Sequence, residues 1–353
     1  MQSLDNLKGR RVILIGGGGF AGHHLALRLK REGAEVGIID SMMINNYYSL
    51  NDEEHADRYR RMCGDRSALL TRAQIPFIQM DARDYDMLSR ALTAMAPQVI
   101  VQLAAIAHID RSNKDPHTTW DHSMRTLENA LDYARQIPGM HFVYFSSSTA
   151  YGDFGAPVLT EDAICNPKGI YGSLKLCGEI MVRAYHETYN MDHTIVRPCA
   201  LYGPRCVSGR VIQKFIEAAL QGKPITVRGT GADKEDFTYV DDLVDGVTRV
   251  IANPLSRNET FNITAGQARS LGELAGLVQA HFPNTPIHNV DRDPEKPHRG
   301  TMSVDKARRL LGYEPRYQLE DGIEAYVRWF VDFWPYLGEL SNAEKPQVES
   351  VLS

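Results

Sequence analysis

The chain lacks long hydrophobic runs, clusters of basic residues and low-complexity tracts. Its apolar runs are far too short to cross a bilayer or to form the hydrophobic core of a secretion signal. No run of lysine and arginine is long enough to make a nucleic-acid surface, and the net charge is −5 at pH 7. These absences predict a protein that binds neither nucleic acid nor a membrane.

Paired cysteines are missing as well. The five cysteines are odd in number and include no Cys-x-x-Cys pair; they are Cys63, Cys165, Cys177, Cys199 and Cys206. This pattern suggests neither a disulfide framework nor a metal site, and it is typical of proteins of the reduced cytoplasm. We therefore expect a cytoplasmic protein without a bound metal.

Short apolar runs that alternate with helical stretches dominate what is present. Of the 353 residues, 43% are hydrophobic, which is enough for a sizeable core in one large domain or two joined ones. Strands that are apolar throughout are buried on both faces, which indicates a parallel sheet of βαβ units. The expected strands of this doubly wound α/β fold are Val12–Ile15, Val36–Ile39, Phe77–Met80, Val99–Leu103, Phe142–Phe145 and Thr194–Val196.

The first strand runs directly into a glycine-rich turn that holds Gly16, Gly19 and Gly22. Phe20 and Ala21 then open a helical stretch. Glycines permit a tight turn and let backbone amides approach a pyrophosphate, while the helix N-terminus supplies a positive dipole. Such a turn alone can also be purely structural, so the argument needs the context that follows.

Asp40 supplies this context, because it ends the second strand about 20 residues after the turn, where a carboxylate can accept both ribose hydroxyls. An acid there repels a 2′-phosphate, so the pattern favours NAD over NADP; the alternative is a solvated acid at a strand end. Asp81, followed by Ala82, closes the third strand and is placed either to bind the adenine amine or to cap the next helix. The small residues Leu103, Ala104 and Ala105 end the fourth strand and allow a cofactor to lie close to the backbone.

Tyr171 and Lys175 are four residues apart in a stretch of helical periodicity, so they share one helical face. A free tyrosine has a pKa of about 10, and a nearby cation would favour the phenolate needed for proton transfer. A surface pair on a helix is the simpler interpretation. The four hydroxyl residues Ser146–Thr149, at the end of the fifth strand, make the catalytic one stronger, since ligands of such sheets bind at carboxyl strand ends. At least two of those hydroxyls are expected to be turn caps.

Together these motifs resemble the extended short-chain dehydrogenases/reductases that act on nucleotide sugars. The resemblance runs from about Arg11 to about Trp329. The motifs that carry it are Gly16–Gly22, Leu103–Ala105, Ser146–Gly152, Tyr171–Lys175, Arg197–Pro204, Asp236–Gly246 and Ala307–Pro315.

The resemblance implies a first step in which Tyr171 removes a proton from a sugar hydroxyl, usually at C4, as hydride passes to NAD. It also implies that Lys175 holds the nicotinamide ribose and that Ser147 steadies the substrate oxygen. Ser148 and Thr149 stand where related dehydratases carry an Asp-Glu pair, and the resemblance implies that they lie against the substrate. Hydroxyls there are similar to the UDP-glucose 4-epimerase branch, which oxidises the sugar and reduces it again with retained NADH.

Other activities stay open. A dehydrogenase or dehydratase of the same family is the alternative, and an NAD-sensing binding protein is a remote one. The sequence departs from the family pattern at four places, so we expect the substrate to be held in an altered way. They are the dehydratase-like Ala107–Ser112, and His122, Ala200 and Glu235 in place of two asparagines and an arginine. Lys234 is placed to replace the missing charge or to be an ordinary exposed lysine.

The resemblance also suggests how substrate and partner are held. Arginines that are candidates for the nucleotide diphosphate, or else ordinary surface residues, are Arg205, Arg210, Arg228 and Arg299, of which Arg299 is the strongest. A homodimer is implied through the helices Asp121–Gln136 and Lys168–Tyr189, although a core face has the same apolar stripe.

The predicted organisation has two interleaved units. Residues 8–197 with 236–264 are assigned to an NAD-binding Rossmann domain, and 198–235 with 265–335 to a smaller nucleotide-sugar domain. Short strands such as Ile225–Arg228 and Phe261–Ile263 are expected in the region beyond about Pro198. The segment Ser41–Ile75 is long and polar, with a helix expected around Glu53–Cys63, and has the length to act as a flap. Residues 336–353 are a tail, which we expect to fray from about Asn342.

Overall fold

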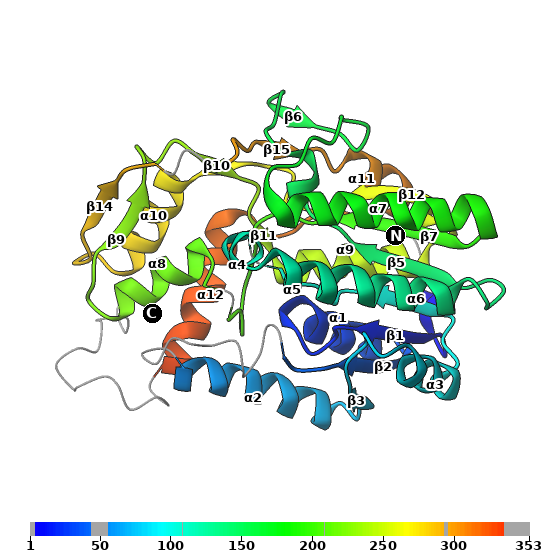
Figure 1. Cartoon of the computed structure of the whole chain (residues 1–353). Coiled ribbons are helices and arrows are strands. Elements are labelled where there is room, and N and C mark those ends of the chain that lie inside the picture. Colours follow the sequence, from blue (N-terminus) through cyan, green and yellow to red (C-terminus); the bar gives the residue numbers. More distant parts are fainter. Residues whose placement is uncertain (1–3, 44–55, 108, 208, 293–295, 335–353) are drawn as a thin grey trace.

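A parallel sheet of seven strands forms the centre of the protein (Figure 1). The computed structural model describes residues 4–43, 56–107, 109–207, 209–292 and 296–334. The strand order is β12-β7-β5-β4-β1-β2-β3, with every neighbouring pair parallel. The strands are β1 (Arg11–Ile15), β2 (Glu35–Asp40), β3 (Phe77–Gln79), β4 (Val99–Gln102), β5 (His141–Phe145), β7 (Asp192–Arg197) and β12 (Glu259–Asn262). The doubly wound Rossmann-type fold expected from the sequence is confirmed.

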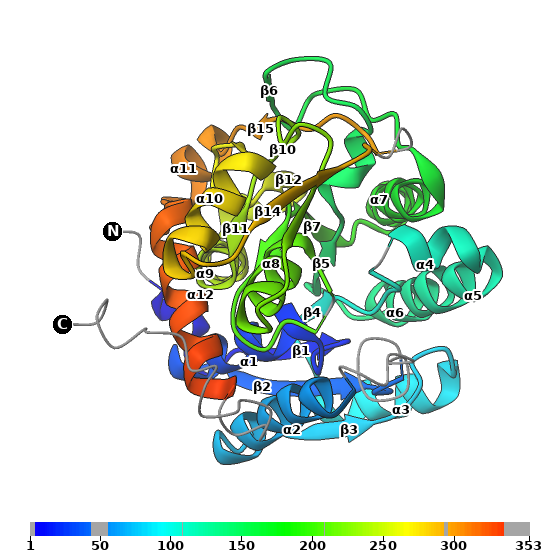
Figure 2. The same cartoon turned by 90° about the vertical axis from the view of Figure 1, so that its left-hand side faces the viewer.

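Helices cover both faces of this sheet (Figure 2). One face carries α1 (Phe20–Arg31), α2 (Ala56–Arg72) and α9 (Val240–Ala252), and the other α3 (Tyr85–Met95), α6 (Thr126–Ala134) and α7 (Gly169–Tyr189). Alternate residues of β1 show why helices are needed on both faces of the sheet. Val12 and Leu14 pack into the core beneath α1 and α9, while Ile13 and Ile15 pack into the core beneath α3 and α6. A strand buried on both faces has to be apolar at every position.

A second lobe lies at the carboxyl end of the strands (Figure 1). Its elements are α8 (Val211–Leu220), α10 (Leu271–His281), α12 (Leu319–Phe333), the parallel pair β9 (Ile225–Arg228) and β14 (Ile287–Val290), and the antiparallel pair β10 (Lys234–Glu235) and β13 (Arg269–Ser270). Aromatic residues of α12, among them Tyr326 and Phe330, fill its core. Carboxyl strand ends and this lobe together frame the site.

Shorter elements connect the two parts. They are α4 (Ile109–Lys114), α5 (Pro116–Trp120), α11 (Asp305–Leu311), β6 (Val158–Leu159), β8 (Leu201–Tyr202), β11 (Thr238–Tyr239) and β15 (Thr301–Met302). A π-helical turn, Asp121–Arg125, links α5 to α6. Among the described residues no helix has both the length and the apolar character required to cross a bilayer.

Two expectations about the segment after β2 need correction. The helix expected around Glu53–Cys63 is α2, which extends to Arg72 because Leu70 packs into the core of the sheet. Its middle is buried as well, with Met62 and Cys63 almost inaccessible to solvent. The described part of this segment is therefore a packed helix and not a flap. Residues 44–55 and the expected frayed tail lie outside the described residues.

Candidate active site

The glycine-rich turn joins β1 to α1 with no room for larger side chains. Gly16 has φ +85°, and a Cβ atom there would lie 2.5 Å from the amide nitrogen of Ala104. A Cβ atom on Gly22 would lie 2.6 Å from the Cα atom of Gly17. Gly19 precedes α1 without a side-chain cap, so the first amides of the helix stay available for an anionic ligand.

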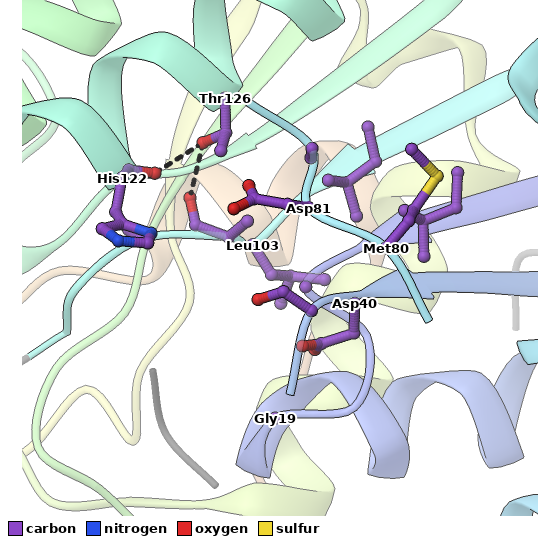
Figure 3. Close-up of a pocket in the computed structure, with 14 residues that line it drawn as sticks. Gly19, Asp40, Met80, Asp81, Leu103, His122 and Thr126 are labelled. Atoms are coloured by element: carbon purple, nitrogen blue, oxygen red, sulfur yellow. Dashed lines mark hydrogen bonds between the residues drawn. The ribbon is translucent and has the colours of Figure 1, made fainter. Parts of the chain in front are cut away.

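A cavity opens beside this turn, at the carboxyl ends of β1, β2, β3 and β4 (Figure 3). Asp40 and Asp81 lie within it in the close-up, and His122 and Thr126 close its far side. The residues of the expected cofactor site that line it are Gly16, Gly19, Asp40, Asp81, Ala82, Leu103, Ala104 and Ala105. The expected residues Phe20, Ala21 and Gly22 lie in the first turn of α1 and do not line it.

Asp40 is fixed by two backbone amides. Its Oδ2 accepts a hydrogen bond from the Gly18 amide at 2.9 Å, and its Oδ1 accepts one from the Met42 amide at 2.8 Å. Burial raises the pKa of Asp40, while these amides and the charge of Arg66 act in the opposite direction. A carboxylate has about four acceptor positions, so Asp40 keeps the capacity to accept ribose hydroxyls. The glycine turn, the uncapped helix start and this acid fit a dinucleotide.

Asp81 does not cap the next helix, so the capping role considered for Asp81 from the sequence is wrong. The N-cap of α3 is Asp84, whose Oδ1 accepts from the Met87 amide at 2.9 Å. Asp81 instead pairs with Arg83 at 2.6 Å, and hydrogen bonds from Arg83 lower the pKa of Asp81. His122 and Thr126 also line this end of the cavity, and no motif had marked them as cofactor residues.

Tyr171 and Lys175 lie in the first two turns of α7, as their spacing predicts. The Nζ of Lys175 donates a hydrogen bond to the Phe145 carbonyl at 2.6 Å, at the end of β5. Burial lowers the pKa of Lys175 to about 8, against an opposing effect of Glu179. Burial raises the pKa of Tyr171, while Arg210 and a hydrogen bond with Ser147 act to lower it. The Nζ of Lys175 also lies 6.0 Å from the centre of the Tyr171 ring, and a lowering of the tyrosine pKa by Lys175 stays a prediction.

The four hydroxyl residues after β5 have different partners. Ser146 donates to Glu179 Oε1 at 2.5 Å, inside the protein. Ser147 accepts from the Thr149 amide at 3.2 Å and contacts Tyr171. Ser148 bonds to Cys199, and the buried Oγ1 of Thr149 has no partner among the described residues. Ser147 is thus the hydroxyl that the fold brings to Tyr171.

Comparisons with known proteins agree with this geometry. The model of the NAD dependent epimerase/dehydratase family matches residues 12–264. This chain belongs to that family. It is an enzyme family, and its cofactor is NAD.

Individual relatives are distant but match over nearly their full length. UDP-glucose 4-epimerase of Mycolicibacterium smegmatis is 29% identical, over 91% of this chain and 98% of its own. A structure of UDP-glucuronic acid 4-epimerase from Bacillus cereus, with UDP-glucuronic acid and NAD, has a TM-score of 0.80 at 25% identity, over 91% and 99% of the two chains. The dTDP-glucose 4,6-dehydratase DesIV of Streptomyces venezuelae has a TM-score of 0.81 at 25% identity, over 92% and 98%.

The four arginines considered for the diphosphate do not converge in this epimerase/dehydratase family member. Arg299 donates to the carbonyls of Ser148 and Gly152, and Arg210 is the N-cap residue of α8 and acts electrostatically on Tyr171. The remaining two lie elsewhere, Arg205 in an ion pair with Asp65 on α2 and Arg228 exposed on β9. Of the four, Arg299 lies beside Ser148, and Arg210 is close enough to act on Tyr171.

Glu235, a departure from the family pattern, and its neighbour Lys234 lie on β10, and their side chains have different surroundings. Lys234 is exposed and lines a shallow cleft with Arg299 and Thr301. Glu235 is half-buried, and the Sγ of Cys199 lies 3.7 Å from its Oε2. Burial raises the pKa of Glu235, against the opposing charges of Arg299, Lys296 and Arg210. A carboxyl group therefore lies next to Cys199, which itself bonds to Ser148.

Proposed function

We propose that this enzyme is an NAD-dependent nucleotide-sugar epimerase that acts at C4. The observation that supports it is the contact of Ser147 with Tyr171 at the end of β5, with the hydroxyls of Ser148 and Thr149 in place of paired carboxylates. NAD, when bound, would supply the acceptor for hydride from the sugar carbon and the donor for its return. Without a carboxylate on that loop, oxidation followed by reduction from the other face is the simplest reaction.

The residues of this chain would divide the work as follows. Tyr171 exchanges a proton with the sugar hydroxyl, and Ser147 holds the same oxygen by a hydrogen bond. Lys175, anchored at the Phe145 carbonyl, is placed to hold the nicotinamide ribose. Asp40 and the amides at Gly19 hold the adenosine ribose and the pyrophosphate.

A nucleotide sugar as substrate is supported by the relatives and by two arginines. Arg299 and Arg210 lie beside the catalytic groups and can bind phosphate oxygens. The relatives differ in sugar and in nucleotide, since their names give UDP-glucose, UDP-glucuronic acid and dTDP-glucose.

A second candidate is an enzyme that stops at the keto sugar or eliminates water from it. It is favoured by Glu235, whose carboxyl contacts Cys199 and so lies near Ser148. The match to a dehydratase supports it too.

A substrate panel separates the two. The purified protein with NAD would be incubated with UDP, dTDP, GDP and CDP sugars and followed by NMR and by absorbance at 340 nm. A stereoisomeric sugar with no lasting absorbance supports the epimerase. Lasting absorbance, or a 4-keto-6-deoxy product, replaces it with the second candidate.

We also propose a homodimer formed by α6 and α7, which pack side by side. The exposed side chains on α7 include Ile180 and Tyr189, at 57% and 48% exposure. Two such helices from each subunit would bury this apolar surface. Light scattering gives the mass, and Ile180→Asp should convert a dimer to a monomer. A location in the cytoplasm remains a prediction from the unpaired cysteines.

A further inference from the structure

Arg66, in the middle of α2, contacts two distant parts of the chain at once. Its Nε and Nη2 donate to the Arg205 carbonyl at 3.1 and 2.5 Å, and its Nη1 donates to the Gly18 carbonyl at 3.5 Å. The side chain is 1% exposed. One buried guanidinium therefore joins the cofactor turn to the segment at which the chain enters the second lobe.

That segment is held from several sides. Arg205 has φ +65°, a backbone conformation that costs energy for a residue other than glycine. Its guanidinium pairs with Asp65, the neighbour of Arg66 on α2. The preceding carbonyl, of Pro204, contacts His24 Nε2 of α1 at 3.0 Å. Such a conformation persists only when its surroundings fix it, and Arg66 supplies two of the hydrogen bonds that do so.

The helix that carries Arg66 belongs to both cores. Tyr59 and Met62 pack into the core of the second lobe, while Leu70 packs into the core of the sheet. Figure 1 shows α2 running from the end of α12 toward β3. Arg66 is thus located where the two cores meet.

At the cofactor turn, both backbone polar groups of Gly18 have partners, and Arg66 supplies one of them. The Gly18 amide donates to Asp40, and the Gly18 carbonyl accepts from Arg66. Gly18 lies between Gly16 and Gly19, both of which line the cofactor cavity. A Cβ atom on Gly18 would lie 3.1 Å from Asp40 Oδ2, so the turn has little freedom to shift.

We infer that Arg66 is a positioning residue through which the second lobe retains the dinucleotide. It holds the turn that receives the pyrophosphate in a fixed place relative to that lobe, and its buried positive charge favours the anionic ligand. Release of the cofactor then requires the turn to move against this contact. In the epimerase proposed above, slow release would keep the reduced cofactor in place between the two half-reactions, and this last step alone depends on the proposed function.

The test is the rate at which NADH leaves the protein, measured by stopped-flow displacement with excess NAD. The variants are Arg66→Met, which loses charge and hydrogen bonds, and Arg66→Lys, which keeps the charge but not the forked geometry. We expect release from Arg66→Met to be about tenfold faster or more, as for loss of a charge-assisted buried hydrogen bond, and release from Arg66→Lys to be intermediate. Asp65→Asn removes the charge that pairs with the Arg205 side chain. We therefore expect it to accelerate NADH release by a smaller factor than Arg66→Met does.

Arg60→Met is the matched control, since Arg60 is on the same helix but is 47% exposed and pairs with Asp57. Wild-type release rates in both Arg66 variants would overturn the inference. A purely structural role would lower the melting temperature without NAD and leave the release rate unchanged, which also overturns it. If Arg66→Met does not fold, Arg66→Lys decides alone. No sugar is needed for this measurement, so failure of the proposed epimerase leaves it intact.

Discussion

The ammonium group of Lys175 lies 2.6 Å from the carbonyl oxygen of Phe145, the last residue of β5. The lysine is 6% exposed, and burial lowers its pKa to about 8. An unfolded lysine keeps its proton up to about pH 10.4. Between these values the unfolded chain binds more protons than the folded one, so this group makes stability rise with pH.

Lys175→Met should therefore remove a pH dependence of stability from the NAD-free protein. The full effect between about pH 8 and pH 10.5 is on the order of 3 kcal/mol, at 1.36 kcal/mol per pKa unit. Urea unfolding of wild type and variant at pH 7.5 and pH 10 gives the difference. Equal changes with pH in the two proteins would show that Lys175 titrates normally.

Tyr171→Phe should abolish turnover while leaving NAD bound. The substitution removes only the hydroxyl that contacts Ser147, and loss of a general acid or base costs about 10²- to 10⁴-fold in rate. Ser147→Ala should lower the rate less, because Tyr171 keeps its place on α7. Turnover with the best substrate of the panel and calorimetric titration with NAD are the measurements. Full activity in Tyr171→Phe would mean that another group exchanges the proton, whereas absence of turnover in the wild type with every sugar of the panel would support the NAD-sensing alternative.

The fold and the placement of Tyr171 and Lys175 on one helix could be predicted because their signals are local. The strands follow from apolar runs, and the distance between Tyr171 and Lys175 follows from helical spacing. The role of Arg66 could not, because α2 is polar in sequence and its partners, Gly18 and Arg205, lie 48 and 139 residues away. The partner of Arg205 could not be predicted for the same reason. Its guanidinium group suits a phosphate but pairs with Asp65, which only the tertiary fold brings near.

The partner of Ser146 was also beyond local pattern. It is the buried Glu179, which accepts two hydrogen bonds from Arg197 at 2.9 and 2.7 Å. Burial alone would raise the pKa of Glu179, but the hydrogen bonds and charge of the Arg197 side chain lower it below its usual value. This network ties α7 to the ends of β5 and β7.

Arg197→Met should therefore destabilise the protein strongly. It leaves the charge of Glu179 in the interior with Arg183 as its remaining ion-pair partner among the described residues, and breaking a buried pair costs about 3–5 kcal/mol. Arg183→Met is the control, since Arg183 is 39% exposed and its pair should contribute about 1 kcal/mol or less. Urea unfolding at pH 7 measures both. Similar small losses in the two variants would mean that water or a rearranged lysine compensates Glu179.

Glu235→Gln should tighten substrate binding and change its dependence on pH. The carboxyl group of Glu235 lies near Arg299 and Arg210, the two arginines beside the catalytic groups, and its charge opposes theirs. Burial raises the pKa of Glu235, so the group gains its negative charge later than a free glutamate as the pH rises. Binding of an anionic nucleotide sugar should weaken through that range in the wild type.

The glutamine variant carries no charge at any pH, so its affinity should stay level where that of the wild type falls. At neutral pH we expect about tenfold tighter binding, the effect of removing one like charge at intermediate distance in a partly buried site. Glu324→Gln is the matched control, because it removes the same charge from α12, where Glu324 is 57% exposed and pairs with Arg328. Calorimetry with the substrate from the panel, on the three proteins at pH 6 and pH 8, supplies the six affinities. Weaker binding by Glu235→Gln, with the pH dependence unchanged, would instead mean that Glu235 accepts hydrogen bonds from the sugar and belongs to the binding site as an acceptor.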